Sequence, residues 1–335
     1  MKEVKFAFIV DSCGVSSYYI NKGICYDYKN NQPFTNHNSL SSSCMVGMWS
    51  YPFIFNGCFL NWGEWGDNLP DYDLEIIIVA IEKDFNLYSV SKLRKKYPNA
   101  HIIGMIKEIF LGNVNEFGFS PAFESEKHKN RIKFLNECDS VIQPFPDIET
   151  SPLSHLLNDC KNKITYVPFA INVDYIYDTY YNTEKYESIF AYTTPTHGRR
   201  SNTLEFAKYI SNKYNIPYYT KPIDKNQFNI PLADLYSLWT QSTMHFNLDP
   251  VKWFPGSQGV QVAAAGVINV GGLNDSHTQL FPDLATNNTS KLETIIENII
   301  SDPKERVRIM SYAYNKVNEL YSFNTVKQQI EKIIK

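Results

Sequence analysis

The chain has 335 residues, which is long enough for two domains of ordinary size. Its apolar share of 43% and its net charge of -3 exclude a chain that is disordered over most of its length. The balance of 32 Lys and Arg residues against 35 Asp and Glu residues excludes a strong overall attraction to nucleic acid or to an anionic membrane. Aromatic residues make up 15% of the chain, enough to line a core, a stacking groove or both.

The first half of the chain predicts a parallel sheet, because short apolar runs bounded by turn residues alternate with helical patterns. The predicted strands are residues 4–10, 75–81, 101–106, 140–144 and 164–169. The predicted helices between them are residues 87–97 and 125–138. This alternation indicates a first Rossmann-like domain over residues 1–180.

Residues 21–71 interrupt this alternation with an irregular, aromatic-rich insertion. A stretch of this length without a regular pattern often belongs to a binding surface. One interpretation is an insertion whose rings stack on an acceptor, and the other is a packed excursion of the core. The sequence favours neither. The rings that would contact an acceptor are Trp49, Tyr51, Trp62 and Trp65.

Residues 175–187 are polar and Tyr-rich without clear periodicity, so we expect them to link two domains. The strand and helix patterns then start again. The predicted strands are residues 188–193, 216–220, 243–248 and 267–270, and the predicted helices are 201–214, 232–241, 290–301 and 303–321. The chain is therefore predicted to be an α/β protein with two Rossmann-like, doubly wound domains that face each other across a cleft. The second domain is predicted over residues 186–318, and a C-terminal helix over 319–335.

No window of about 18 uncharged apolar residues occurs, so we expect no membrane span. The short apolar run at residues 4–10 ends at Asp11, which indicates a buried strand rather than a signal peptide. The six cysteines form no CxxC pair, and we expect reduced thiols rather than a zinc site. A cytoplasmic protein is therefore predicted.

Residues 253–270 carry the strongest chemical signal. A turn with Gly256 and Gly259 opens onto a helix of small residues, which ends at Gly266 and leads into a buried strand. Glycines let a backbone approach a ligand, and a helix N-terminus offers free N–H groups to phosphate oxygens. A tightly packed helix–strand unit without a ligand would have the same pattern, so local sequence leaves both interpretations open.

Arg199 and Arg200 follow the predicted strand at residues 188–193, at its carboxyl end. Guanidinium groups bind phosphate oxygens with two parallel hydrogen bonds and keep their charge at all physiological pH values. The alternative is a pair of surface arginines. Their position favours ligand binding for at least one of them, and His197 is the histidine best placed beside them.

Together, residues 188–206 and 253–270 resemble the nucleotide-sugar signature of GT-B glycosyltransferases. The chain is most similar to divergent members such as phage DNA-base glucosyltransferases and sporulation-type glycosyltransferases. Gln261 stands where the family has a ribose-binding Glu, and Trp253 stands where retaining members have a second Glu. The resemblance also implies that the last helix packs back on the first domain. The implied donor-binding residues are His197, Arg199, Arg200, Lys221, Gly256, Ser257, Gln258 and Gln261.

Transfer with inversion needs a general base on the acceptor hydroxyl. Glu108 follows the predicted strand at residues 101–106, and Asp11 follows the first strand, so these two are the predicted catalytic residues. A solvated or capping carboxylate is the alternative for each. A retaining enzyme needs no such base, because the leaving diphosphate can assist, and the sequence leaves the stereochemistry open. No Asp-x-Asp motif stands in a suitable loop, so we expect catalysis without a metal.

The predicted activity is transfer of a sugar from a nucleotide diphosphate, of which a UDP-sugar fits best, to a hydroxyl acceptor such as a glycan, with no further cofactor. A modified DNA base is another acceptor that the resemblance allows, and the near-neutral charge disfavours it. A sugar-nucleotide epimerase or a catalytically silent nucleotide-sugar-binding module would also fit the sequence.

Overall fold

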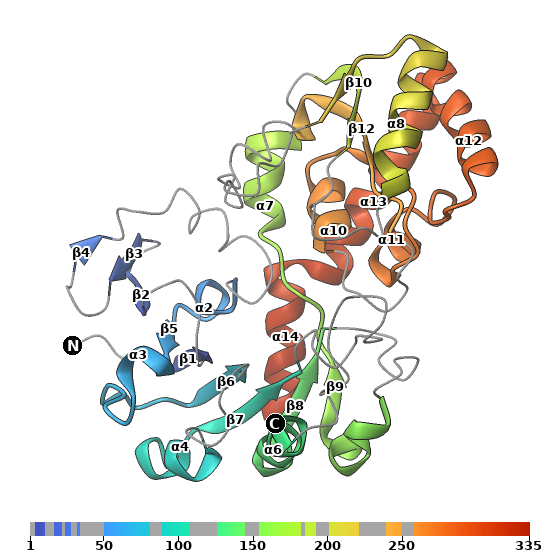
Figure 1. Ribbon diagram of the computed structural model, residues 1–335. Helices are drawn as coiled ribbons and strands as arrows, with labels where there is room; N and C mark the ends of the chain where they lie inside the picture. Colours follow the sequence, from blue (N-terminus) through green and yellow to red (C-terminus); the bar gives the residue numbers. More distant parts are fainter. Residues whose placement is uncertain are drawn as a thin grey trace. The chain divides into compact units, whose positions relative to one another are not determined.

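The structure is a computed structural model (Figure 1). It describes twelve ranges of the chain. These ranges are residues 4–10, 17–21, 24–27, 32–33, 50–80, 89–106, 126–144, 154–181, 185–191, 201–220, 239–249 and 257–335. They divide into two compact units. The first unit contains the described residues from 4 to 33 and from 50 to 168, together with Val326–Lys335, and the second contains the described residues within Phe169–Thr325.

A sheet of nine described strands forms the centre of the first unit, in the order β4-β3-β2-β5-β1-β6-β7-β8-β9. From β5 to β9 the strands are all parallel, and β2, β3 and β4 extend the sheet with antiparallel pairing. The parallel strands are β5 (Cys58–Asn61), β1 (Phe6–Val10), β6 (Ile76–Ala80), β7 (His101–Met105), β8 (Ser140–Gln143) and β9 (Ile164–Tyr166). The antiparallel strands are β2 (Tyr18–Asn21), β3 (Ile24–Asp27) and β4 (Gln32–Pro33). All five strands predicted in this half are confirmed, as are the helices α4 (Val90–Lys96) and α6 (Glu126–Glu137).

The two faces of β1 show how the aromatic residues of the first unit are used. Because side chains alternate along a strand, Phe6 and Phe8 point to one face and Ala7 and Ile9 to the other. The ring of Phe8 stacks with Tyr51 at 5.6 Å and with Phe59 at 6.0 Å between centroids. Such stacked pairs contribute about 0.5–1.5 kcal/mol beyond the area that they bury. Part of the aromatic excess therefore lies in a ring layer within the core.

The expectation of an irregular insertion over residues 21–71 is wrong for β5, which lies beside β1 at the centre of the sheet. All four of its residues are buried. The strand is too short to stand out as an apolar run, and aromatic and turn residues flank it on both sides. A Cβ atom on Gly57 would lie 2.4 Å from the carbonyl oxygen of Phe6, so the glycine lets the chain pass close to β1.

The second unit contains a parallel sheet of four described strands in the order β11-β10-β12-β13. The strands are β10 (Tyr186–Ala191), β11 (Tyr218–Tyr219), β12 (Ser242–Phe246) and β13 (Ile268–Val270). The helices include α8 (Ser201–Tyr214), α10 (Ser257–Ala264), α11 (Asp275–Leu280), α12 (Thr289–Ser301) and α13 (Pro303–Tyr321). α13 begins as the sequence predicts, because Asp302 caps its first turn and Pro303 occupies its first position.

The described residues of the expected linker, 175–181 and 185–187, group with the second unit, and two of them, Ile176 and Tyr180, belong to its core. α7 (Val173–Ile176) continues directly into the π-helical segment η6 (Tyr177–Tyr181), and Ile176 and Tyr180 are buried. The rings of Tyr177 and Tyr181 each lie 4.9 Å from the ring of Tyr314 on α13. A change from α-helical to π-helical spacing within nine residues leaves no regular period, which is why the sequence pattern indicated a linker.

The last helix, α14 (Phe323–Ile334), presents Val326 and Ile330 to a buried interior. Its residues from Val326 onward group with the first unit, where the Lys327 ammonium lies 5.9 Å from the ring centre of Phe55. None of the helices that the structure describes is both long and apolar enough to cross a membrane.

Candidate functional site

The carboxyl edge of the second sheet brings together the ends of two strands and the starts of two helices. β12 and β13 are parallel neighbours, so their carboxyl ends lie at the same edge. The amide of Leu248, just beyond β12, donates to Oγ1 of Thr203 at 3.1 Å and so holds the first turn of α8 there. In open parallel sheets ligands bind beyond the carboxyl ends of the strands. This edge is the candidate site of the second unit.

A network of buried polar side chains lies at this edge. Asn269 Oδ1 lies 2.9 Å from Nδ1 of His245, and Asn269 Nδ2 donates to the carbonyl oxygen of Gly271 at 3.1 Å. Gln258 Nε2 lies 3.2 Å from His245 Nε2, and Gln258 Oε1 accepts from Nδ2 of Asn247 at 3.2 Å. The network therefore connects the interior of β12 and β13 to Gln258, which is half-buried in the first turn of α10. Loss of one partner from such a network costs about 1–3 kcal/mol, which holds its members to one arrangement.

His245 is enclosed by aromatic rings and is fully buried. Its ring centre lies 5.8 Å from that of Phe190 and 5.7 Å from that of Trp239. Phe190 stacks on this ring, and Trp239 meets it at a steep angle. His245 therefore orients its neighbours from the interior of the unit.

Two glycines make room for the buried ring of His277, which joins the network where its Nδ1 lies 3.2 Å from Nδ2 of Asn269. A Cβ atom on Gly259 would lie 2.2 Å from His277 Cδ2, and one on Gly272 would lie 2.0 Å from His277 Nδ1. Gly272 also has a φ of +89°, which side-chain-bearing residues rarely adopt. Gly259, part of the predicted glycine turn, thus allows α11 to pack its histidine against α10.

The predicted donor residues Gln258 and Gln261 both lie on α10, with Gln258 half-buried and Gln261 buried. Ser257 begins the same helix, and its side chain is outside what the structure describes. The following predicted site residues lie outside the described residues: Asp11, Trp49, Glu108, His197, Arg199, Arg200, Lys221 and Gly256.

Sequence reasoning missed Asn247 and Asn269. Asn269 is the middle residue of β13, between two buried aliphatic residues, and it is itself fully buried. A polar side chain inside a buried strand requires hydrogen-bonding partners, and this requirement is the signal that could have identified it. Asn247 could have been identified only by its place directly after β12.

In the first unit, the predicted acceptor residues Tyr51 and Trp62 belong to the core, with exposed fractions of 0% and 1%. Burial raises the pKa of the Tyr51 hydroxyl well above its usual value. Rings without an exposed face cannot stack on an acceptor, so these two assignments are corrected to packing roles. Trp65 is half-buried, and its Nε1 donates to Oγ of Ser17 at 2.7 Å, where the amide of Asn61 also donates.

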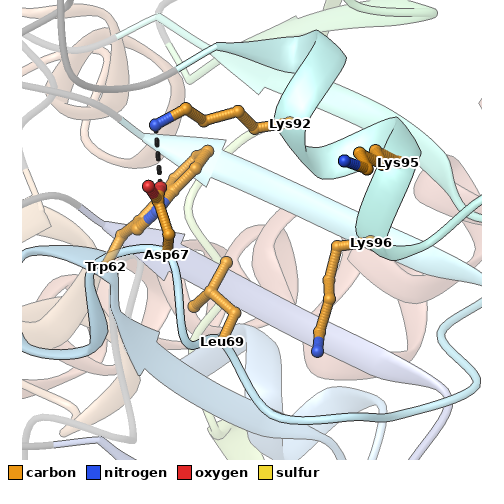
Figure 2. A pocket seen from close by; sticks show the side chains of 6 residues that line it. All are labelled: Trp62, Asp67, Leu69, Lys92, Lys95 and Lys96. Atoms are coloured by element: carbon orange, nitrogen blue, oxygen red, sulfur yellow. Dashed lines mark hydrogen bonds and ion pairs between the residues drawn. The ribbon is translucent and has the colours of Figure 1, made fainter.

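A pocket of about 370 Å³ lies between α4 and the segment that follows α3 (Trp62–Trp65). Figure 2 shows the three lysines of α4 that line it, and Asp67 beside the ammonium of Lys92, with which it pairs at 2.8 Å. Lys96 pairs with Asp71, whose side chain is almost fully exposed. The lining residues are Trp62, Asp67, Leu69, Lys92, Lys95 and Lys96.

The part of the chain that the structure describes holds no group of three or more His, Cys, Asp or Glu side chains that could bind a metal ion.

No protein-family model matches the sequence, and no curated protein matches it. Solved structures, in contrast, match over nearly the whole chain. An α-glucosyltransferase in complex with UDP and a 13-mer DNA containing an HMU base has a TM-score of 0.60 and 12% identity, with 99% of each chain covered.

Two further similar structures cover nearly the whole chain. Anabaena Alr3699/HepE in complex with UDP and glucose has a TM-score of 0.57 and 11% identity, covering 98% of this chain and 99% of that chain. Sucrose-phosphate synthase from Thermosynechococcus elongatus has a TM-score of 0.57 and 12% identity, covering 99% of this chain and 98% of that chain. The chain therefore has the GT-B fold, and the predicted class of two Rossmann-like α/β units is confirmed.

Proposed function

We propose that the protein is a glycosyltransferase that takes a sugar from a nucleotide diphosphate, of which a UDP-sugar is the best candidate, and transfers it to a hydroxyl acceptor. The observation that carries this proposal is the polar network at the carboxyl edge of the second sheet, which reaches the first turn of α10 through Gln258. Similar GT-B structures were solved with UDP, and one with UDP and glucose, which supports the same class of donor.

The donor would lie with its diphosphate near the N-terminus of α10, where free backbone N–H groups and the helix dipole favour negative charge. The side-chain oxygen of Gln261 would accept a hydrogen bond from a ribose hydroxyl. From their place in the sequence, Arg199 and Arg200 would pair with the diphosphate, His197 would contact it and Lys221 would lie near the base. In the transfer, the bond from the anomeric carbon to the diphosphate oxygen breaks and a bond to the acceptor oxygen forms. The leaving charge passes to these cations and N–H groups without a metal.

The acceptor's proton has two possible destinations. In an inverting reaction Glu108 or Asp11 would take it as general base, and in a retaining reaction the leaving diphosphate would take it. Replacing Glu108 and Asp11 separately by the corresponding amide distinguishes the two. Loss of turnover by about 10²-fold or more in one variant identifies the base, and full activity in both favours the retaining reaction.

The first experiment is thermal unfolding of the full chain with UDP-glucose, UDP-galactose and UDP-N-acetylglucosamine, followed by measurement of UDP release. A donor present at 100 times its Kd contributes about 2.7 kcal/mol, which raises the Tm of a unit of about 150–250 residues that unfolds by itself by roughly 5–10 °C. Arg200→Ala should abolish that rise. Arg308→Ala is the matched control, since Arg308 pairs with Glu305 on the surface of α13.

The remaining outcomes of this experiment identify the competing functions. Stabilisation without UDP release, with or without acceptors, would indicate a silent binding module, and an isomerised sugar would indicate an epimerase. No stabilisation by any nucleotide would contradict the proposal.

A modified DNA base is a second candidate acceptor, and Lys95, which lines the first unit's pocket beside the ion-paired Lys92 and Lys96, favours it. Phosphate contacts release counterions, so each contact adds about -0.9 to the slope of log affinity against log salt concentration. A duplex that contains HMU should then bind with a slope that Lys95→Ala makes shallower, whereas Lys316→Ala, on the surface of α13, should leave it unchanged. Equal slopes in both variants would exclude a role for the pocket in DNA binding.

A further inference from the structure

In the polar network of the second unit, donor and acceptor are fixed for each hydrogen bond, because the network begins at a backbone carbonyl. A carbonyl oxygen can only accept, so the atom of Asn269 that lies 3.1 Å from the oxygen of Gly271 must be the amide nitrogen. Asn269 therefore presents its oxygen, Oδ1, to His245. In its neutral form the ring of His245 carries one proton, and beside this oxygen that proton is on Nδ1, which donates at 2.9 Å.

The same reasoning continues outward through α10. Since Nδ1 of His245 carries the proton, Nε2 is an acceptor, and it faces the amide nitrogen of Gln258 at 3.2 Å. Gln258 then presents Oε1 to Asn247, whose Nδ2 donates to it at 3.2 Å. Each step pairs one donor with one acceptor. Reversing any of the three amides would place two acceptors or two donors against each other.

Asn247 ends this series of hydrogen bonds. Its Nδ2 is used to donate to Gln258, so the polar side-chain atom that remains is the acceptor Oδ1. Asn247 is 1% exposed, and its Oδ1 has no hydrogen-bonding partner among the residues that the structure describes. A buried carbonyl oxygen without a partner is destabilising by about 1–3 kcal/mol, and native proteins rarely leave one unsatisfied. The atom lies directly beyond β12, at the edge where ligands of such sheets bind, and next to the first turn of α10.

We infer that Oδ1 of Asn247 is a specificity-determining acceptor for one hydroxyl group of the bound nucleotide sugar, and that Asn269, His245 and Gln258 are positioning residues that present it. This inference rests on the proposed function. The hydroxyl belongs either to the ribose or to the transferred sugar, because both offer the same donor. A ligand that presents an acceptor at this point, such as a carbonyl or a phosphate oxygen, is disfavoured because two lone pairs would face each other.

The experiment measures, by calorimetry on the full chain, the affinity for UDP-glucose, for its analogue with 2′-deoxyribose and for analogues that lack one glucose hydroxyl. The quantity that decides is the ratio between the affinities for UDP-glucose and for each deoxy analogue. One analogue should bind the native protein about 10- to 100-fold more weakly. In Asn247→Leu that ratio should fall to about 1, because the partner of the hydroxyl is gone. Which analogue responds identifies ribose or sugar as the source.

Asn247→Asp provides a second variant of almost the same volume, which also serves if the leucine variant does not fold. It keeps an acceptor oxygen, so the ratio should persist even though its negative charge weakens all diphosphate ligands alike. Asn274→Ala is the matched control, since Asn274 is also a buried Asn, but its Oδ1 already accepts from the amide of His277 at 3.0 Å. The Asn274→Ala variant should be less stable than the native protein, but its ratio of affinities for UDP-glucose and the deoxy analogue should be the native one.

An unchanged ratio in Asn247→Leu would overturn the inference while the binding of UDP-glucose still upheld the proposed function. Failure of the native protein to bind any of these ligands would overturn both. Binding of UDP-glucose with no preference over any deoxy analogue would also overturn the inference.

Discussion

The two units differ in how far their interacting polar groups are exposed to water. At the edge of the second sheet, four of the five linked side chains that the structure describes are buried, and each hydrogen bond determines the direction of the next. Around the first unit's pocket, Lys92 pairs with Asp67, whose side chain is 73% exposed, so water can replace either partner. A missing partner is costly only where water cannot take its place. We therefore expect selective recognition in the second unit and tolerant, salt-sensitive binding in the first.

The largest expected effect comes from filling the space beside His277. Gly272→Ala combines a positive φ with a Cβ atom 2.0 Å from a ring nitrogen, and it should lower the free energy of unfolding by about 2–5 kcal/mol. Urea denaturation measures this loss. Gly66→Ala is the control from the first unit, since its φ is also positive but no atom of the described residues lies within 4 Å of the added Cβ. It should cost less, about 1–3 kcal/mol, and equal losses would contradict the steric explanation.

The next effect tests the anchor of the polar network. Asn269→Asp replaces the Nδ2 donor with an acceptor that faces the carbonyl oxygen of Gly271. The free energy of unfolding should fall by about 1–3 kcal/mol in urea denaturation at neutral pH. Asn288→Ala, which removes the exposed cap of α12, is the comparison and should cost about 1 kcal/mol. If Asn269→Asp lowered the free energy of unfolding by less than Asn288→Ala, the network would tolerate an acceptor in place of the Nδ2 donor.

A half-buried charge of the second unit gives a smaller effect that depends on pH. Burial lowers the pKa of Lys185 from 10.5 to about 8. Between these two values the unfolded chain holds a proton that the folded chain lacks, so the stability of the native protein rises with pH in this window. Below pH 8 the penalty of the buried charge is fully present. Lys185→Met should therefore be more stable than the native protein at pH 7, by about 1 kcal/mol after solvent screening, and less so at about pH 10.

Thermal unfolding of both proteins between about pH 7 and 10 measures this difference. A difference that stays constant over this range would contradict the low pKa of Lys185.

The smallest effect is expected at the pocket in Figure 2. A double-mutant cycle with Lys92→Ala and Asp67→Ala should give a coupling of about 0.2–1 kcal/mol, because both side chains are substantially exposed. The coupling should shrink further in about 0.5 M salt. A coupling that exceeded about 2 kcal/mol and resisted salt would show that this pair is held as rigidly as the network of the second unit.

Sequence reasoning succeeded where a local pattern determines the structure. The buried runs that became β1, β6 and β7 read as strands because apolar residues are continuous and turn residues bound them. It failed for β5, because four residues between aromatic neighbours carry too little pattern, and only pairing with β1 and β2 makes them a strand. The local patterns could not place Asn247 against Gln258 either, since that contact depends on how α10 docks on β12.

The grouping of Val326–Lys335 with the first unit has a consequence for how the protein is made. A ribosome releases the chain from its N-terminus, so the first unit leaves the exit tunnel long before its final helix exists. Until then, the surface that Val326 and Ile330 cover is open to water or to other chains. The unit that is synthesised first is thus the one completed last. A chain that terminated before residue 326 would contain the whole second unit, but its first unit would lack the final helical segment.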